Sequence, residues 1–551
     1  MRRHKARRQA LQLLYQTEIT GRDIEDVISE SLSSGGMEPF ALFLARGVAQ
    51  RLQRIDEIIS EFASGWQPET MPTVDLIIQR IGVFELVFTD SPSPVAIDEA
   101  VELAKEYSTE DAARFVNGVL DSVAAERQRL LRGEQRLSVS EMFVLPPALG
   151  DGSTKEAFPA DLCPPAYGSR SLAEVGSWIL AAMGVGDWDE DTYELPIPPS
   201  LRRLVVFVID GLGAIQLREH RDVLSDIWEL AGTFATSTFP STSATGLTSI
   251  CTAQVPAIHG IVGYRLLERG RSFNVIRFAY DQDAADAKLA FSGIGRPLKA
   301  PALPSPKKYQ PCRTVFEIIG TAKIGAYVIT RDEFEGSGFS SLLLRGASWA
   351  SYSRSSEIPN RVRSLLEDRR RKLVYVYWDG LDKEGHAAGP TSQRWADAAA
   401  KANSLCEKIL ATLKPGDGIL VTSDHGMIST PEESRIVADR DVKDLCRAVV
   451  GEPRVRYLHA RPGSEEALFE AASERFGDSG LVFKRDRAIS LGLFGDVPSP
   501  DVQSRIGDVI VAMRGDSVLV DPDWPQDPPL GSHGSLTEGE MFVPFRVAVG
   551  G

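Results

Sequence analysis

Apolar side chains in the first 135 residues recur every three or four positions, which is the spacing of one face of an α-helix. In the first such stretch this face is formed by Ala6, Ala10, Leu13 and Leu14. The stretch VDLIIQRIGVFELVF (74–88) is apolar nearly all round, which predicts a buried central helix. Farther along, Ser108 and Asp111 form a pattern like a capping box and predict a helix start. We therefore expect residues 1–135 to form an all-helical domain.

The pattern changes after residue 135. Residues 136–170 are rich in Pro, Gly and Ser, which predicts a linker or an irregular segment. Beyond them, short β-branched runs alternate with helical stretches: RLVVFVID (203–210), IGAYVIT (324–330), KLVYVYWD (372–379), GILVTSDH (418–425) and FVPFRVAV (542–549). Apolar runs bounded by turns are typical of strands covered on both faces. The alternation predicts an α/β domain over residues 171–551, with a largely parallel central sheet.

Length and charge fit this division. A chain of 551 residues is too long for one hydrophobic core, so two or three domains are expected. The net charge of −15 argues against the chain as a whole being a polyanion binder. The first helix is an exception, because residues 2–8 carry basic side chains and no acid: Arg2, Arg3, Lys5, Arg7 and Arg8. These residues indicate either a solvated helix face or a small nucleic-acid footprint.

The sequence also bears on the compartment. Its cysteines are scattered and form no CxxC pair, which suits a reducing cytoplasm. No apolar stretch approaches the roughly 20 residues that a membrane-spanning helix needs. The basic N-terminus is not followed by an uncharged core and a small-residue cleavage site, so it is not a secretory signal. We expect a cytoplasmic protein without a membrane partner.

Several of the predicted strands end in a carboxylate, often with a histidine nearby. Asp210 closes the first run, and Asp424 and His425 close the fourth. Asp382 and His386 follow the third, and His533 lies near the C-terminus. The carboxyl ends of strands in open α/β sheets are where ligand sites form. Carboxylates gathered there repel one another unless they are protonated or bridged by cations, and Asp with His suits zinc or manganese.

A hydroxyl-rich segment precedes a predicted helix. The stretch FATSTFPSTSATGLTSICTAQVPAIHGIVGY (234–264) contains many Ser and Thr side chains. They could merely cap the helix. Alternatively, one hydroxyl at the helix N-terminus could act as a nucleophile, because backbone N–H groups there attract phosphate and a metal lowers the pKa of the oxygen.

Residues from about 160 to 551 resemble the alkaline phosphatase superfamily, in its type I phosphodiesterase/nucleotide pyrophosphatase branch. The motifs that carry the resemblance are VIDGLG, FPSTSATGLTSICTA with HGIVGY, DKEGHAAGP, TSDHGM and GSHG, in the family order. The resemblance implies two divalent metal ions, typically zinc. It assigns one ion to Asp382, His386 and His533, and the other to Asp210, Asp424 and His425.

The same resemblance implies the reaction. Ser243 aligns with the family's nucleophilic Thr, and Thr242 is the alternative. The implied mechanism is in-line attack on a phosphoester through a phosphoseryl intermediate, and the substrate is a phosphoester or nucleotide small molecule. Ser243 stands where the family usually has Thr, and Gly246, three residues on, has no side chain that could donate to phosphate. Monoester, diester and pyrophosphate substrates therefore remain open.

Residues 1 to about 130 resemble transcription antitermination factor NusB. The matching stretches include RRHKARRQALQLLYQTEITG, SPVAIDEAVELAKEY and RFVNGVLD. The resemblance implies an all-helical bundle that binds leader ribosomal RNA together with the ribosomal protein NusE. Lys5 and Arg7 match the family's basic positions, with Arg3 and Arg8 as further candidates for phosphate contacts.

The two halves thus predict two functions in one chain, an RNA-binding transcription factor and a metal-dependent phosphoesterase. Two alternatives remain. The second half could be a neighbouring reading frame joined to the first, with Met142 as its original start. It could also be a binding module without catalysis, in which case only the antitermination function is physiological.

Overall fold

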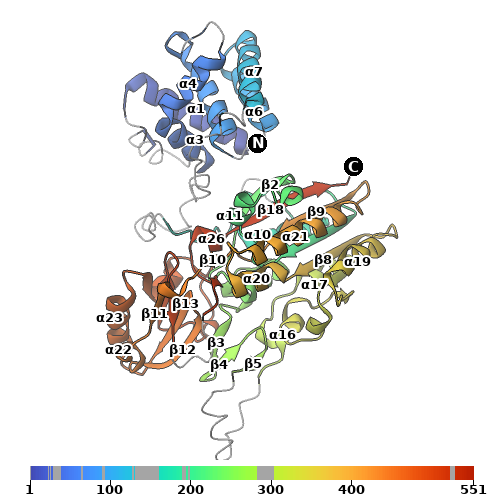
Figure 1. The fold of residues 1–551 in the computed structure, drawn as a ribbon, viewed down its shortest axis with the longest axis vertical. Coiled ribbons are helices and arrows are strands. Elements are labelled where there is room, and N and C mark those ends of the chain that lie inside the picture. Colours follow the sequence, from blue (N-terminus) through green and yellow to red (C-terminus); the bar gives the residue numbers. More distant parts are fainter. Residues whose placement is uncertain are drawn as a thin grey trace, which may run out of the picture. The chain divides into compact units, whose positions relative to one another are not determined.

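The structure is a computed structural model that describes residues 2–22, 24, 27–28, 31, 39–63, 66, 68–89, 93–126, 130, 161–188, 194–196, 199–281, 303–521 and 528–550. The chain divides into two compact units, Met1–Pro146 and Pro147–Gly551, and each is described by itself (Figure 1). Most of the predicted linker, residues 136–170, lies outside the described residues, so the predicted domain boundaries stay a prediction.

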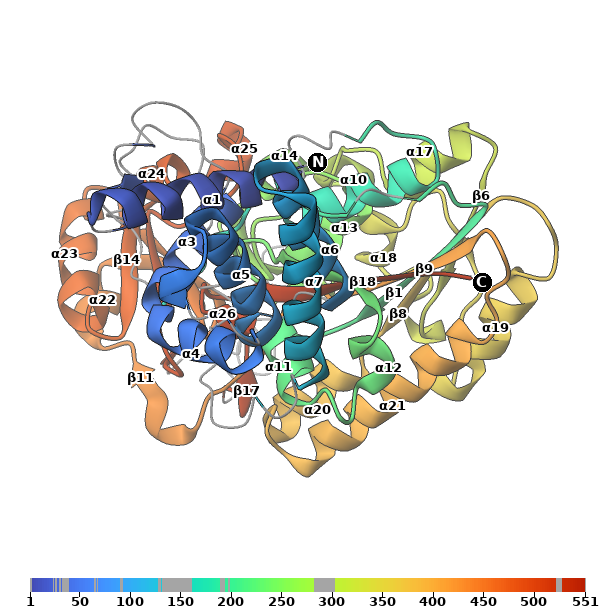
Figure 2. The same ribbon diagram turned by 90° about the horizontal axis from the view of Figure 1, so that it is seen from above.

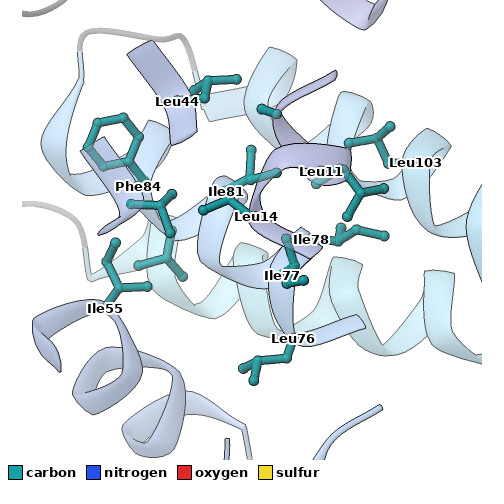
Figure 3. Packing of buried hydrophobic residues seen from close by; sticks show 14 of the residues in the cluster. Leu11, Leu14, Leu44, Ile55, Leu76, Ile77, Ile78, Ile81, Phe84 and Leu103 are labelled. Atoms are coloured by element: carbon teal, nitrogen blue, oxygen red, sulfur yellow. The ribbon is translucent and has the colours of Figure 1, made fainter. Parts of the chain in front are cut away.

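Every described element of the first unit is helical, as predicted. The elements are α1 (Arg2–Thr20), α3 (Pro39–Gln50), α4 (Leu52–Phe62), η1 (Pro68–Thr70), α5 (Thr73–Val83), the π-helical turn η2 (Phe84–Phe88), α6 (Ser93–Tyr107) and α7 (Glu110–Ala125). The predicted buried helix over 74–88 corresponds to α5 and η2, and leucines and isoleucines of neighbouring helices pack around it (Figure 3). The four apolar positions of the first helix face are all buried.

The start of α7 differs from the prediction by one residue. Thr109, not Ser108, occupies the N-cap, and its side chain accepts a hydrogen bond from the Ala112 backbone N–H at 3.1 Å. Either residue offers a hydroxyl at this point of the chain. The extended backbone of Thr109 allows its oxygen to reach the first turn.

The second unit is built on a seven-stranded sheet in the order β2-β18-β9-β1-β8-β6-β7. The strands are β1 (Arg203–Ile209), β2 (Ala231–Thr236), β6 (Gly325–Ile329), β7 (Ser348–Trp349), β8 (Lys372–Trp378), β9 (Asp417–Thr422) and β18 (Phe542–Val549). The five strands from β9 to β7 are parallel to one another, whereas β18 is antiparallel to both β9 and β2. The predicted α/β fold with a largely parallel sheet is confirmed.

Helices cover both faces of this sheet. Figure 2 shows α10 (Leu172–Ala182), α13 (Ser243–Thr252) and α17 (Val315–Thr321) on one face, and α12 (Ser225–Trp228), α19 (Ile358–Leu365), α20 (Gly380–Ala388) and α21 (Gln393–Leu410) on the other. The second group packs through Val362, Trp395 and Ala399 against Val205 and Phe207 of β1. Burial on both faces explains why the central strands have no polar side of their own.

Smaller sheets lie beside the main one. An antiparallel sheet in the order β12-β13-β15-β14 consists of β12 (Cys446–Glu452), β13 (Val455–Ala460), β14 (Gly480–Lys484) and β15 (Val509–Met513). A three-stranded sheet holds β3 (Arg265–Glu268), β4 (Arg271–Asn274) and β5 (Ala279–Tyr280). Two-stranded pairs join β10 (Ile428–Ser429) to β17 (Gly531–Ser532) and β11 (Arg435–Val437) to β16 (Val518–Val520). The remaining described helices are α11 (Ala214–Glu219), α14 (Pro256–His259), α16 (Pro306–Tyr309), η3 (Asp332–Phe334), α18 (Ser340–Leu343), η4 (Ser355–Glu357), η5 (Glu432–Ser434), α22 (Arg440–Lys443), α23 (Glu465–Phe476), α24 (Arg485–Ser490), α25 (Pro500–Gln503) and α26 (Glu538–Met541).

Candidate metal centre

Three adjacent parallel strands end at the same edge of the main sheet. The register pairs Ile209 of β1 with Trp378 of β8, and Val208 of β1 with Thr422 of β9. Asp210 follows β1 directly, and Asp424 follows β9 after one intervening residue. The fold therefore brings together carboxylates that are more than 200 positions apart in the sequence.

The first candidate ligand group consists of Asp210, Asp424 and His425, all buried, with one ligand atom of each residue within 4.8 Å of the others. The Nε2 atom of His425 lies 3.4 Å from Asp210 Oδ1 and 3.6 Å from Asp424 Oδ2. Neither of these two oxygens has a hydrogen-bond partner within the described part of the chain. Buried oxygens without a donor are costly, and a cation between them would remove that cost.

The second group consists of Asp382, His386 and His533, again with ligand atoms within 4.8 Å of one another. Asp382 and His386 are one helical turn apart on α20, and the turn after β17 supplies His533. Asp382 Oδ1 lies 3.4 Å from His386 Nε2 and 3.9 Å from His533 Nε2. The rings of His425 and His533 stack with centroids 3.5 Å apart, so the two groups are neighbours.

Backbone carbonyls fix the orientation of all three histidines. The Nδ1 atom of His386 lies 2.7 Å from Gly531 O, that of His533 lies 2.8 Å from Ser241 O, and that of His425 lies 2.9 Å from Gly426 O. Nδ1 must donate to reach a carbonyl, so in the neutral ring Nε2 carries the lone pair. Each Nε2 then faces carboxylate oxygens that also carry only lone pairs. This donor set fits two divalent cations, for which the carbonyls would act as the outer partners of the imidazoles.

The electrostatics of the centre lead to the same conclusion. Burial, followed by the charges of Asp424 and Asp382, raises the pKa of Asp210 well above its usual range. Burial, followed by the neighbouring His425 and His386, lowers the pKa of His533 well below its usual range. The site therefore disfavours the anionic form of Asp210 and the cationic form of His533, as expected of a cation site considered without its ion.

Tyr377, near the end of β8, was not identified from the sequence. Its hydroxyl donates to Asp210 Oδ2, the oxygen that does not face His425. Burial raises the pKa of Tyr377 well above its usual range, which keeps the phenol protonated and able to donate. The sequence feature that could have identified Tyr377 is a phenol in a largely apolar strand, one position before the strand's last residue. By contrast, Asp379, which ends the same predicted run, belongs to neither group and receives a hydrogen bond from Arg331 at 2.9 Å.

The two candidate nucleophiles differ in their relation to the ligand groups. Ser243 is the first residue of α13, and its Oγ atom lies 3.1 Å from His425 Nε2, at the edge of the first ligand group. Thr242 precedes it as the buried N-cap of α13, and no hydrogen bond joins its side chain to either ligand group in the described part of the chain. Among the two hydroxyls, only that of Ser243 is directed at the ligand group.

The helix that begins at Ser243 has unused donors. Thr242 is the N-cap of α13, yet its side chain makes no capping hydrogen bond. The carbonyl of Thr242 accepts from the N–H groups of Thr245 and Gly246, at 3.0 and 2.8 Å. The N–H groups of Ser243 and Ala244 have no acceptor in the described part of the chain. Donors of this kind at a helix N-terminus attract anions such as phosphate.

In the first unit, the predicted RNA-contacting residues have different environments. Lys5 and Arg8 are exposed on α1, and Arg8 Nε donates to the hydroxyl of Tyr107 at 2.7 Å. The predicted RNA contact of Arg7 is wrong, because its side chain is 1% exposed. It forms a bidentate ion pair with the equally buried Glu85, at 2.8 and 2.7 Å. A guanidinium held there cannot reach a phosphate on the surface. The side chain of Arg3 lies outside the described residues.

Comparison with known proteins assigns both halves. The family model of type I phosphodiesterase/nucleotide pyrophosphatase matches residues 204–536, and the NusB family model matches residues 4–125. The transcription antitermination protein NusB of Saccharopolyspora erythraea is 43% identical over 139 residues, which cover 24% of this chain and 94% of that protein. The chain belongs to both families. It joins a NusB-family domain to a type I phosphodiesterase/nucleotide pyrophosphatase-family domain.

A further relative and two solved structures are also similar. NusB of Anaeromyxobacter dehalogenans strain 2CP-1 is 42% identical over 141 residues, covering 24% of this chain and 98% of that protein. Murine ectonucleotide pyrophosphatase/phosphodiesterase 5 is 16% identical with a TM-score of 0.48, over 63% of this chain and 88% of that one. Phosphonoacetate hydrolase of Sinorhizobium meliloti 1021 is 19% identical with a TM-score of 0.47, over 63% and 90%. Among the described helices of this chain, none is both long and apolar enough to span a bilayer.

Proposed function

We propose that the phosphodiesterase-family domain is a metal-dependent phosphoric ester hydrolase that uses Ser243 as its nucleophile and holds two divalent cations, zinc or manganese. One cation is assigned to Asp382, His386 and His533, and the other to Asp210, Asp424 and His425. The observation that carries the proposal is the Ser243 hydroxyl, 3.1 Å from His425 Nε2, beside two groups of unpaired carboxylate oxygens and imidazoles. The substrate is a small phosphoester or nucleotide.

When bound, the two cations would lower the pKa of the attacking hydroxyl and offset the negative charge of the phosphoryl group. The chain's own groups supply the rest. Ser243 Oγ attacks phosphorus, the bond from phosphorus to the leaving oxygen breaks, and the serine proton passes to solvent. The free N–H groups of Ser243 and Ala244 donate to the oxygens of the phosphoryl group as its charge rearranges.

The second step restores the enzyme. A water oxygen attacks the phosphorus of the phosphoseryl ester from the side opposite Ser243 Oγ, the Oγ–P bond breaks, and Ser243 takes up a proton. Tyr377 holds Asp210 through both steps by donating to the oxygen that does not face His425. Backbone carbonyls hold the three histidines in one tautomer.

The test compares Ser243→Ala with Thr242→Ala in the full chain, using nitrophenyl mono- and diesters in the presence of zinc or manganese. We expect Ser243→Ala to lower kcat by at least about a thousandfold, as is typical for loss of a nucleophile. Thr242→Ala should retain its phosphoseryl intermediate, detected by mass spectrometry after rapid acid quench. Full activity of Ser243→Ala would refute the nucleophile, and absence of metal-dependent hydrolysis in the wild type would favour a binding module.

For the NusB-family domain we propose RNA binding in transcription antitermination, with leader ribosomal RNA and the ribosomal protein NusE as partners, in the cytoplasm where such RNA is made. The proposal is supported by the 43% identity to an antitermination protein over 94% of its length. Lys5 and Arg8 are the proposed phosphate contacts, with Arg3 as a third candidate. Binding of a leader RNA, with and without NusE, by the full chain tests this function, and immunoblotting of native extract tests whether both functions reside in one polypeptide.

A further inference from the structure

A pocket lies on the side of α20 that does not carry the candidate metal ligands. Its volume is about 480 Å³, and it is bounded by the start of α20, by the neighbouring α21 and by the segments that follow β6 and β7. At about 100° per residue, Asp382 and His386 lie about 40° apart around the helix, whereas Lys383 and Glu384 lie about 100° and 200° from Asp382. Neither the six candidate ligands nor Ser243 line the pocket, so it is separate from the metal centre.

The charged side chains that line this pocket are mostly cations. Glu384 is already paired, because Arg394 Nη2 lies 2.6 Å from its Oε2 atom. The ammonium groups of Lys383 on α20 and Lys401 on α21 have no ion-pair or hydrogen-bond partner within the described residues. Two positive charges therefore border the pocket without a carboxylate of the described chain to offset them. The full set of charged lining residues is Arg331, Lys383, Arg394 and Lys401, with the carboxylates Glu384 and Asp397.

The start of α20 adds backbone donors beside the two lysines. Gly380, the first residue of the helix, lines the pocket, and the N-cap Asp379 makes no side-chain capping hydrogen bond. The N–H groups of Gly380 and Leu381 have no acceptor in the part of the chain that the structure describes. Gly380 also allows Trp378 to lie against the helix start, because a Cβ at this position would collide with the indole ring. A helix N-terminus carries partial positive charge, so helix and lysines present charge of the same sign to this space.

We infer that this pocket is a second anion site, which binds the phosphate group of a small phosphorylated molecule. The ammonium groups of Lys383 and Lys401 offer several donors each, and phosphate oxygens accept from such groups and from helix N-termini. The volume falls within the range of about 300–1,000 Å³ that is usual for small-molecule pockets, which leaves room for an organic part beside the phosphate. The Ser355 hydroxyl, which has no partner among the described residues, lines the same pocket and can bind that organic part. The inference does not depend on the hydrolysis proposed at Ser243.

The experiment measures the binding of phenylphosphonate, a stable analogue of a phosphate monoester, to the full chain by isothermal titration calorimetry. Metal is removed beforehand with a chelating resin, because soluble chelators are themselves polyanions that could occupy the pocket. The variants are Lys383→Ala, Lys401→Ala and the double variant. Lys408→Ala is the matched control, because Lys408 is an exposed lysine of α21 that does not line the pocket. Phthalate, an aromatic dianion without phosphorus, is the second probe.

Each single variant should weaken the binding of phenylphosphonate about five- to tenfold, because it removes one charge-assisted hydrogen bond, and the double variant should weaken it at least about 25-fold. Lys408→Ala should bind phenylphosphonate as the wild type does, although it loses the same charge. Phthalate should bind the wild type at least about fivefold more weakly than phenylphosphonate, because its carboxylates offer fewer oxygens to the same donors. The thermal midpoints of all variants should match that of the wild type, since the lysines are exposed.

Three results would overturn the inference. The first is a wild type that does not bind phenylphosphonate, or that binds it no more tightly than Lys383→Ala and Lys401→Ala do. The second is binding that appears only after zinc is restored, because the anion would then lie at the metal centre. The third is binding of phthalate as tight as that of phenylphosphonate, which would exclude phosphate as the group recognised. The activity of Ser243→Ala tests the proposed hydrolysis separately, because Ser243 does not line the pocket.

Discussion

Removing one carboxylate from the candidate metal centre should have opposite effects with and without metal. The facing oxygens of Asp210 and Asp424 lie within 4.8 Å of each other. Two unit charges at that separation repel by about 3 kcal/mol at an effective dielectric constant near 20. At a pH that ionises both carboxyls, Asp210→Asn removes this repulsion in the metal-free protein, so its thermal midpoint should rise by roughly 5 °C, since about 3 kcal/mol moves a large domain by about that amount.

The pH dependence sets the conditions of the assay. The pKa of Asp210 is raised by burial and by Asp424, so the folded wild type retains a proton that the unfolded chain releases at lower pH. A raised carboxyl pKa stabilises the fold below the unfolded value, and this stability is lost as pH rises through the folded value. In chelator, the difference in thermal midpoint between Asp210→Asn and the wild type should therefore grow from pH 6 to pH 9.

The assay is differential scanning calorimetry of the full chain in chelator and in excess zinc, with the exposed Asp478→Asn as control. In excess zinc the wild type should have the higher thermal midpoint, because it gains stability from an ion that Asp210→Asn binds poorly. A lower midpoint for Asp210→Asn in chelator, at every pH, would falsify the reasoning that these carboxylates face each other as uncompensated charges.

Further predictions concern neighbouring residues. Tyr377→Phe should weaken metal affinity about 10- to 100-fold in a metal titration of activity, because the phenol orients a candidate ligand carboxylate. The control, Tyr375→Phe on the same strand, should leave the metal affinity unchanged. Equal metal affinities of the two variants would show that Tyr377 does not support the site. Arg7→Ala should destabilise the NusB-family domain by about 3–5 kcal/mol in denaturant unfolding, since Glu85 would be left buried without its partner. A loss of unfolding free energy below about 1 kcal/mol would contradict the role of this ion pair. Lys5→Ala should leave stability unchanged and reduce the salt slope of RNA binding by roughly 0.7 to 1; an unaltered slope would count against a phosphate contact.

The layout of the C-terminal domain was predictable because its chemistry lies at strand ends. Apolar runs that stop at Asp210 and Asp424 define both the central strands and the residues at their carboxyl edge. The structure brings all six predicted ligands into two groups beside Ser243, while their role in holding metal stays a prediction. The sequence could not decide between Thr242 and Ser243, because only the folded chain shows which hydroxyl faces a ligand, and Ser243 Oγ lies 3.1 Å from His425 Nε2.

The error at Arg7 has a physical reason. Arginine side chains are mostly exposed, and the first helix was interpreted through its charge. Yet Arg7 lies three, four and seven positions before Ala10, Leu11 and Leu14, which places it on the buried stripe. Glu85 was the matching signal, an acid within the apolar stretch 74–88. The two residues are 78 positions apart, and only the packed fold shows that they neutralise each other.

The position of β18 has a consequence for biosynthesis. This strand lies between β2 and β9, although it leaves the ribosome about 120 residues after β9. Until then the nascent chain must keep two unpaired strand edges apart, and such edges invite pairing with the wrong partner. A premature stop codon only a few residues upstream of β18 would leave most of the domain translated but its sheet split, so we expect such products to aggregate or be degraded rather than to retain partial activity.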